Sequence, residues 1–225
     1  GILAAIHPKL ALSVKKRQVL EEVETVLNWY RLLYQEDMPE SWLLHLMGLC
    51  MGWKYKETLT LTQRLNFSKR QEREFLELRL SIFESLDKLS WWSSHDGSIS
   101  ALSSILSTLP LEGVLFVMAR SRKEDIRKHI SKYLTSLKDM ATDIGGEDLI
   151  DLGLVPGPMF GTILERVLAA KYDGKVTSKV EQLVMAGNLA RELSAGKAEP
   201  DAEQEEDLPV VTAPMPEHGR KKDKS

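Results

Sequence analysis

Basic side chains concentrate in one stretch of the chain, residues 120–138. Arginine and lysine neutralise phosphate charge, so a row of them on one helix face is typical of a surface that contacts a nucleic-acid backbone. At about 100° per residue, Arg120, Lys123 and Arg127 fall on one flank of the apolar stripe of this segment. A solvated helix face is the alternative interpretation. The candidate phosphate-binding cations are Arg120, Arg122, Lys123, Arg127, Lys128 and Lys132, with Lys171 and Lys175 later in the chain.

A corner rich in glycine and proline follows this basic segment. Gly153 can take the left-handed conformation that ends a short helix at 148–152, and Pro158 suits the first position of the next helix. Helix starts carry N–H groups that can bind phosphate, and glycine lets another backbone approach closely. Gly153, Gly157 and Gly161 are therefore further candidate RNA contacts, although such a corner is also a common turn without a ligand.

His95-Asp96 suggests a different chemistry, that of a metal-dependent phosphohydrolase. Such a site needs a His, a His-Asp pair and a distant Asp around a divalent metal. His45 upstream, with Asp125 or Asp139 downstream, could complete the set. The pair lies in a predicted loop at 91–97 that would not fix its geometry, so we predict no metal site and keep this function as an alternative.

Two tryptophans occupy the same predicted loop. Trp91 and Trp92 could stack on nucleic-acid bases. Anchoring of at least one of them in the core is the favoured interpretation.

The periodicity of apolar residues predicts an all-α protein with no sheet. Capping residues mark helix starts at Ser13, Ser68, Ser121 and Ser178, the last three paired with Gln71, Glu124 and Glu181 in capping boxes. We predict an elongated multi-helix body at 1–110 and a helical, RNA-binding tail at 111–195. Residues 196–225 are rich in charge and poor in apolar side chains, which predicts a disordered extension.

Composition sets the outer bounds. A chain of 225 residues with 43% hydrophobic residues can bury one elongated core or two small ones. No apolar run reaches membrane-spanning length, and no signal-peptide pattern opens the sequence. The single cysteine, Cys50, excludes an internal disulfide and fits a reducing, cytoplasmic setting. Of 30 basic and 33 acidic residues, the segment from Gly196 onward holds 5 and 8, so the rest is neutral overall and binding must depend on local clusters.

The order and spacing of residues around the corner resemble a known family. The matching positions are Asp148-Leu149-Ile150, Leu152-Gly153, Pro156-Gly157-Pro158, Gly161, Ile163-Leu164 and Asp173-Gly174. Together they are similar to the C-terminal signature of bacterial tRNA nucleotidyltransferases, the CCA-adding and A-adding enzymes, and of the related poly(A) polymerases. Leu3–Pro8 resembles a segment of the helical body of the same family, beyond its catalytic head and neck. Because the chain lacks an initiator Met, we expect it to be a fragment that continues upstream of Gly1.

The resemblance implies a non-catalytic, C-terminal RNA-binding part of such an enzyme. This part would bind tRNA or tRNA-like RNA, with the tail toward the outer elbow of tRNA, and position it for 3′-end nucleotide addition by an N-terminal head domain. The implied partners are tRNA and the head and neck domains of the same chain, with no membrane. Magnesium and ATP, together with CTP in a CCA-adding parent, are implied as cofactors of the head and not of this region.

The residues that nucleotidyl transfer requires are not found in the sequence. The family carries a Gly-Ser followed by an Asp-x-Asp that holds two magnesium ions. Gly97-Ser98 is present, but no Asp-x-Asp follows it, and Asp148 and Asp151 are three residues apart. We therefore predict no catalytic residue. A helical protein-interaction scaffold without an RNA role is the main alternative function, and the metal phosphohydrolase is the second.

Overall fold

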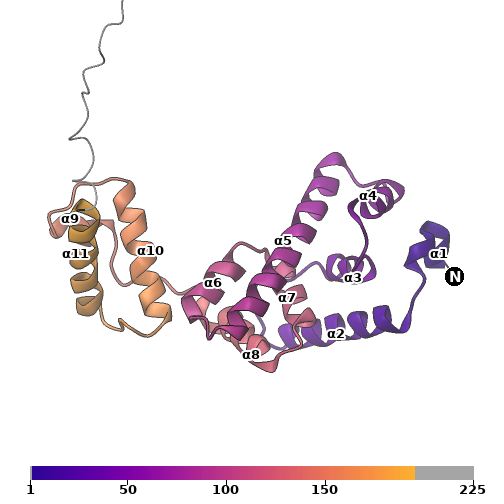
Figure 1. Cartoon of the computed structure of the whole chain (residues 1–225), viewed down its shortest axis with the longest axis horizontal. Helices are drawn as coiled ribbons and strands as arrows, with labels where there is room; N and C mark the ends of the chain where they lie inside the picture. Colours follow the sequence, from indigo (N-terminus) through magenta and orange to yellow (C-terminus); the bar gives the residue numbers. More distant parts are fainter. Residues whose placement is uncertain (1, 196–225) are drawn as a thin grey trace, which may run out of the picture.

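The computed structural model describes residues 2–195, and these residues form helices joined by short connections (Figure 1). In chain order the helices are α1 (Ile2–Ile6), a 3-10 turn (Pro8–Leu10), α2 (Val14–Arg31), α3 (Ser41–Leu49), α4 (Tyr55–Arg64), α5 (Lys69–Ser94), α6 (Ile99–Ser107), α7 (Leu111–Arg120), α8 (Glu124–Lys132), a π-helical turn (Tyr133–Leu137), α9 (Gly146–Asp151), α10 (Pro158–Tyr172) and α11 (Lys179–Ala195). No strand occurs between residues 2 and 195, so the predicted all-α class is confirmed. The predicted disordered extension at 196–225 lies outside the described residues.

Helix α7 lies at the centre of the larger packing unit. Every residue from Gly113 to Ala119 is buried, as expected for a helix that is apolar on all sides. Helix α2 packs on it through a stripe that includes Val19, Val23 and Tyr30, and α3 and α5 cover other sides.

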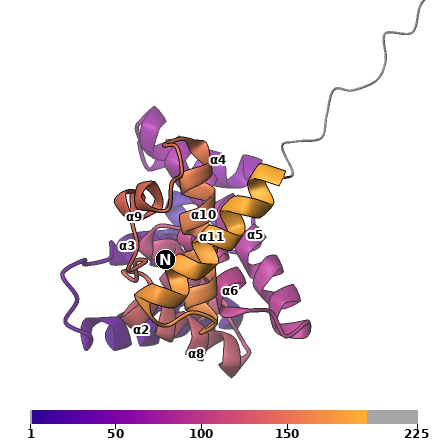
Figure 2. The same ribbon diagram turned by 90° about the vertical axis from the view of Figure 1, so that its left-hand side faces the viewer.

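Helices α9, α10 and α11 form a second, smaller unit with its own apolar core. Leu149, Ile163 and Val167 are fully buried there. Figures 1 and 2 show these helices at one end of the elongated molecule, with α10 reaching back toward α6.

The predicted boundary after residue 110 falls inside the first unit. Leu109 and Val114, on its two sides, belong to one core cluster that continues to Leu137, whereas the second cluster begins at Ile144. We propose that the two units meet at 138–143. The predicted tail includes α7, but the structure packs this helix in the core of the body, so the proposed boundary moves past it.

Helix ends follow most of the predicted caps. Ser13 caps α2, the Ser68–Gln71 capping box starts α5, and Ser178 bonds to Glu181 at the start of α11. The predicted Ser121–Glu124 box is wrong, because the Ser121 hydroxyl donates to the carbonyl of Val117 at 2.7 Å and Lys123 precedes α8. Among residues 2–195, no helix is long and apolar enough to span a membrane.

Candidate nucleic-acid interface

Helix α8 presents cations beside an open groove against α7. The groove has a volume of about 320 Å³ and is lined by Met118, Glu124, Arg127, Lys128 and Ser131. Ile126 and Ile130 are buried beneath, so the helix is fixed by its apolar side while its basic side faces outward. Lys128 pairs with Glu124 at 3.1 Å one turn away, an exposed contact that a phosphate could replace at small cost.

Three further cations lie around the same helix. Arg122 and Lys132 are exposed, and within residues 2–195 neither they nor Arg127 form an ion pair. Lys123 donates to the hydroxyl of Ser93 at 3.0 Å, which ties the start of α8 to α5. The carboxylate of Asp125 also faces α5 and accepts a hydrogen bond from the hydroxyl of Ser93 at 2.9 Å. This hydrogen bond lowers the pKa of the Asp125 carboxyl. The acidic side chain is thus held toward α5.

Two predicted phosphate ligands are instead engaged within the protein. Arg120 ends α7, and its guanidinium binds Glu22 of α2 at 2.7 Å with a side chain only 19% exposed. Lys175 pairs with Asp173 at 3.4 Å but stays mostly exposed. Arg120 therefore joins two helices of the body, which the sequence could not show because its partner lies 98 residues away.

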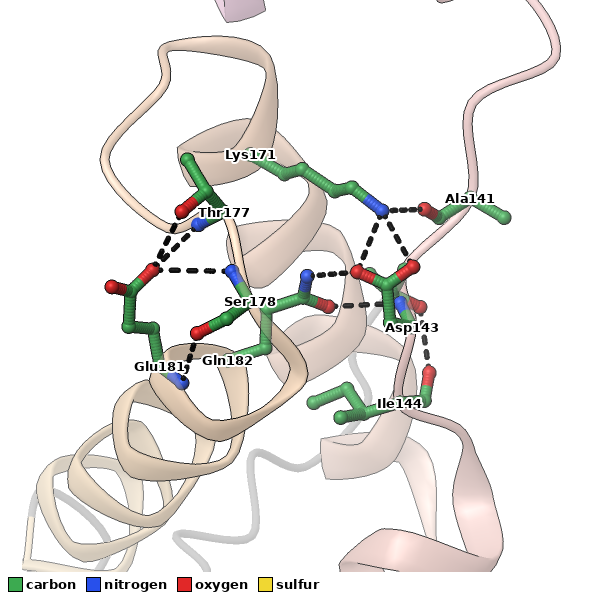
Figure 3. Close-up of polar contacts among 9 residues, drawn as sticks. Ala141, Asp143, Ile144, Lys171, Thr177, Ser178, Glu181 and Gln182 are labelled. Carbon is green, nitrogen blue, oxygen red and sulfur yellow. Dashed lines mark hydrogen bonds and ion pairs between the residues drawn. The ribbon is translucent and has the colours of Figure 1, made fainter.

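Lys171 has the most complete internal coordination of the predicted ligands (Figure 3). Its ammonium donates to both carboxylate oxygens of Asp143 at 2.9 Å and to the carbonyl of Ala141 at 2.8 Å. Asp143 also accepts from Gln182 of α11 at 2.6 Å, and the Lys171 and Gln182 bonds lower the pKa of its carboxyl. Lys171 therefore holds the connection at 138–145 against α10, and the structure gives it a stabilising role.

The glycine-proline corner has the predicted local geometry. Gly153 has φ of +84°, and the N–H groups of Gly153 and Leu154 bond back to Ile150 and Leu149 at 2.8 and 3.1 Å, the Schellman pattern that ends α9. Pro158 opens α10. Within the described residues, no hydrogen bond uses the N–H groups of Gly157 or Met159. These donors are available to an anion at the start of α10.

Neither Gly157 nor Gly161 is required by the packing of the described residues. Gly157 is extended, with φ of 177°, and a Cβ there would meet only the carbonyl of Val155 at 3.9 Å. Nothing lies within 4 Å of a Cβ added to Gly161. The absence of a side chain at these positions leaves the backbone open to a ligand.

The basic helix and the corner are two separate patches. Helix α10 runs from the corner to the junction with α6, and its 15 residues at about 1.5 Å each span about 22 Å. The two patches are adjacent in sequence, but α10 separates them in space.

Arg191 is a cation near the corner that the sequence did not single out. It lines a cavity of about 390 Å³ with Leu152, Leu154, Gly187, Ala190 and Ser194. Its guanidinium binds the side chain of Asn188 at 2.7 Å. No local pattern marks it, because the packing of α11 beside α9 creates its position.

The residues proposed for the alternative chemistries are dispersed. No group of three or more His, Cys, Asp or Glu side chains that could hold a metal occurs in the described part of the chain. The predicted loop at 91–97 is wrong in part, because α5 continues to Ser94. Trp92 is 5% exposed and anchors the core, as favoured, whereas Trp91 is 64% exposed and stacks on His95 with ring centroids 4.4 Å apart.

Comparison with known proteins gives a consistent result. No family model matches the chain. It is 30% identical over 192 residues to the A-adding tRNA nucleotidyltransferase of Geobacter sulfurreducens. The aligned region covers 84% of this chain and 22% of that protein. The fold is similar to that of the Thermotoga maritima CCA-adding enzyme complexed with tRNA, with a TM-score of 0.68 and 18% identity over 85% of this chain and 45% of that one. An apo form of a CCA-adding enzyme gives a TM-score of 0.65 and 18% identity over 87% of this chain and 43% of that one.

The sequence match and the fold match extend over most of residues 2–195, while the chain spans about a fifth of the length of the Geobacter protein. This agrees with the C-terminal body and tail expected from the sequence motifs. In sequence the chain is similar to an A-adding tRNA nucleotidyltransferase, and in fold it is similar to CCA-adding enzymes.

Proposed function

We propose that this chain is a tRNA-binding part of a tRNA nucleotidyltransferase, which positions the RNA for 3′-end addition by another part of the enzyme. The observation that carries the proposal is the 30% identity to an A-adding enzyme over 84% of the chain. The cations of α8 support it, and so do the N–H groups of Gly157 and Met159, which make no hydrogen bond within residues 2–195, because both are suited to phosphate.

Binding is expected to be modest in affinity and independent of base sequence. The proposed contacts are made to phosphates, which carry no base-sequence information. Magnesium with ATP or CTP, in this proposal, belongs to the catalytic part. The head and neck domains of the parent enzyme are the proposed intramolecular partners.

The experiment is a measurement of tRNA affinity over a range of salt concentrations. Arg127→Gln with Lys132→Gln removes two cations that make no ion pair within residues 2–195, so the log–log slope should fall by up to about 1.8. The matched control is Lys15→Gln with Arg17→Gln, which removes one lysine and one arginine from exposed positions of α2. Equal loss in both variants would mean diffuse attraction and would reject the α8 site.

A protein-interaction scaffold makes the opposite prediction. Such a chain would bind tRNA no better than a neutral protein of the same size, and salt would not alter its assembly with a partner protein. Absence of tRNA binding by the wild-type chain at low salt would favour that function.

A further inference from the structure

A cavity of about 460 Å³ lies where the two packing units meet, between α6 and the last turns of α10. This volume is within the range of small-molecule sites in proteins. The π-helical turn after α8 supplies a third wall through Tyr133. The cavity is distinct from both the α8 groove and the corner.

One face of α6 supplies a row of hydroxyl groups to this cavity. Ser100, Ser103, Ser104 and Ser107 follow the i, i+3, i+4, i+7 spacing of one helix face, and all four line it. Ser103 is 3% exposed, and its hydroxyl has no hydrogen-bond partner within the described residues. A buried hydroxyl without a partner is unfavourable. Its Oγ has almost no accessible surface, so the Ser103 side chain must turn before it bonds to a polar group in the cavity.

The opposite wall carries a carboxylate above an apolar surface. Glu165 is exposed at the cavity and forms no ion pair within residues 2–195, while Leu168 and Ala169 lie beside it on α10. A carboxylate accepts two hydrogen bonds from a vicinal diol, as acidic residues do with the ribose of dinucleotides.

The charges around the cavity disfavour an isolated phosphate. Lys138 is its only cation among the lining residues, and its ammonium is already bound to Asp37 at 2.8 Å. Asp173 lies next to the cavity, where its carboxylate accepts hydrogen bonds from the backbone N–H and the hydroxyl of Ser100 at 2.9 and 3.0 Å. With Glu165 unpaired in the described structure, the surroundings suit a neutral, hydroxyl-rich group.

We propose that this cavity binds the ribose of a ribonucleotide. The 2′-hydroxyl donates to Glu165, and so does the 3′-hydroxyl where it is not esterified, as in a free nucleotide or at an RNA 3′ end. The α6 serines bond to the remaining sugar oxygens, and Leu168 with Ala169 contacts the apolar side of the ribose. The proposal rests on the proposed function where the ribonucleotide belongs to bound RNA; a free nucleotide would present the same chemistry. A ribose site would also distinguish RNA from DNA, since the 2′-hydroxyl is one of its contacts.

Two cavity variants with matched controls test this. Ser104→Leu fills the cavity from an exposed position, and Glu165→Ala removes the proposed acceptor; Ser90→Leu and Glu84→Ala make the same changes at exposed positions of α5. The first arm measures adenosine and 2′-deoxyadenosine binding to the whole chain by ligand-observed NMR. The second measures tRNA affinity at two salt concentrations, with folding checked by circular dichroism.

The site is supported if adenosine binds more tightly than 2′-deoxyadenosine and both cavity variants weaken this binding at least about fivefold, with neither control doing so. It is equally supported if only tRNA affinity falls by that factor with an unchanged salt slope, since sugar contacts release no counterions; RNA is then the source of the ribose. If both cavity variants match their controls in both arms, the ribose site is rejected. If the wild-type chain does not bind tRNA, the proposed function is rejected. The adenosine measurements then still decide whether the cavity binds ribose.

Discussion

Arg127 is the residue on which the proposed phosphate contact depends most. It lines the α8 groove and forms no ion pair within the described residues, whereas Arg120 and Lys171 are coordinated by carboxylates of other elements. A cation held in an internal pair must lose that pair before it can bind phosphate. Among the arginines and lysines, those without a carboxylate partner in the described structure are therefore the stronger candidates for phosphate contact.

Replacing Gly161 with alanine is expected to raise the stability of the protein and to weaken its binding to tRNA. It lies in α10 with open space around it, so Gly161→Ala should stabilise the helix by roughly 0.5–1 kcal/mol, as alanine does relative to glycine in helices. The added methyl group should weaken tRNA binding if the RNA backbone approaches there. Thermal melting and tRNA titration of the same variant measure the two effects. An increase in melting temperature with unchanged affinity would remove Gly161 from the interface.

Asp143 should make the stability of the second unit depend on pH. Hydrogen bonds from Lys171 and Gln182 hold its pKa below the ordinary value of 3.8. A lowered carboxyl pKa contributes stability that is complete above the ordinary pKa and is lost as the pH falls through the folded-state pKa. Asp143→Asn should therefore lower the melting temperature at pH 6, and the difference from wild type should shrink toward about pH 3.

The control for this prediction is Asp139→Asn, four residues earlier at an exposed position without an ion pair in the described part of the chain. It should leave the melting temperature nearly unchanged at both pH values. A constant difference between wild type and Asp143→Asn from pH 6 to pH 3 would show that the carboxylate charge is not what stabilises this connection.

Single residues show where sequence-based prediction ends. The charge of Arg120 and Lys171 is visible in the sequence, but their partners lie 98 and 28 residues away and depend on how helices pack. Gly153 and Pro158 could be placed correctly, because their conformations are fixed by neighbours within six residues. Local chemistry is predictable, and availability to a ligand is not.

At the scale of the element, helix α7 decides how the chain divides. Its position in sequence suggested that it opens the tail, yet it is buried on all sides by α2, α3 and α5. Helix α5 gives a related case. Leu89 and Trp92 continue its apolar stripe at a spacing of three, so burial extends the helix through a Ser-rich segment whose composition indicates a loop.

Core substitutions in the two units test the proposed boundary at 138–143. Ile163 is fully buried in α10, so Ile163→Ala should cost about 2–5 kcal/mol of local stability. Hydrogen exchange should show the loss in α9–α11 and leave α2 and α7 protected. Leu115→Ala in α7 is the matched change and should have the reverse pattern. If both substitutions lower protection in both units equally, the chain unfolds as one body and the boundary is wrong.

At the scale of the whole molecule, the elongated shape separates the two proposed phosphate-binding patches by the length of α10 (Figure 1). A short RNA segment would reach only one of them. A folded RNA of the size of tRNA can contact both. The separation of the patches therefore favours a large, structured RNA over a short oligonucleotide.

The chain by itself should not add nucleotides to RNA. Its sequence lacks an Asp-x-Asp after the Gly97-Ser98 pair, and nucleotidyl transfer needs carboxylates that hold magnesium. Incubation with magnesium, labelled ATP and CTP, and tRNA without its 3′ end should give no incorporation above a protein-free control. Clear incorporation by the purified chain would show that a catalytic site exists in it.

The most direct test of tRNA binding is hydrogen exchange of the chain with and without saturating tRNA. Slower exchange is expected in residues 122–132 and 153–161, the α8 patch and the corner, with no change in α2 and α4. Protection of both segments by tRNA, and its loss at high salt, is the predicted result. Saturation by tRNA without protection of either segment would contradict the proposed interface and place the RNA elsewhere on the protein.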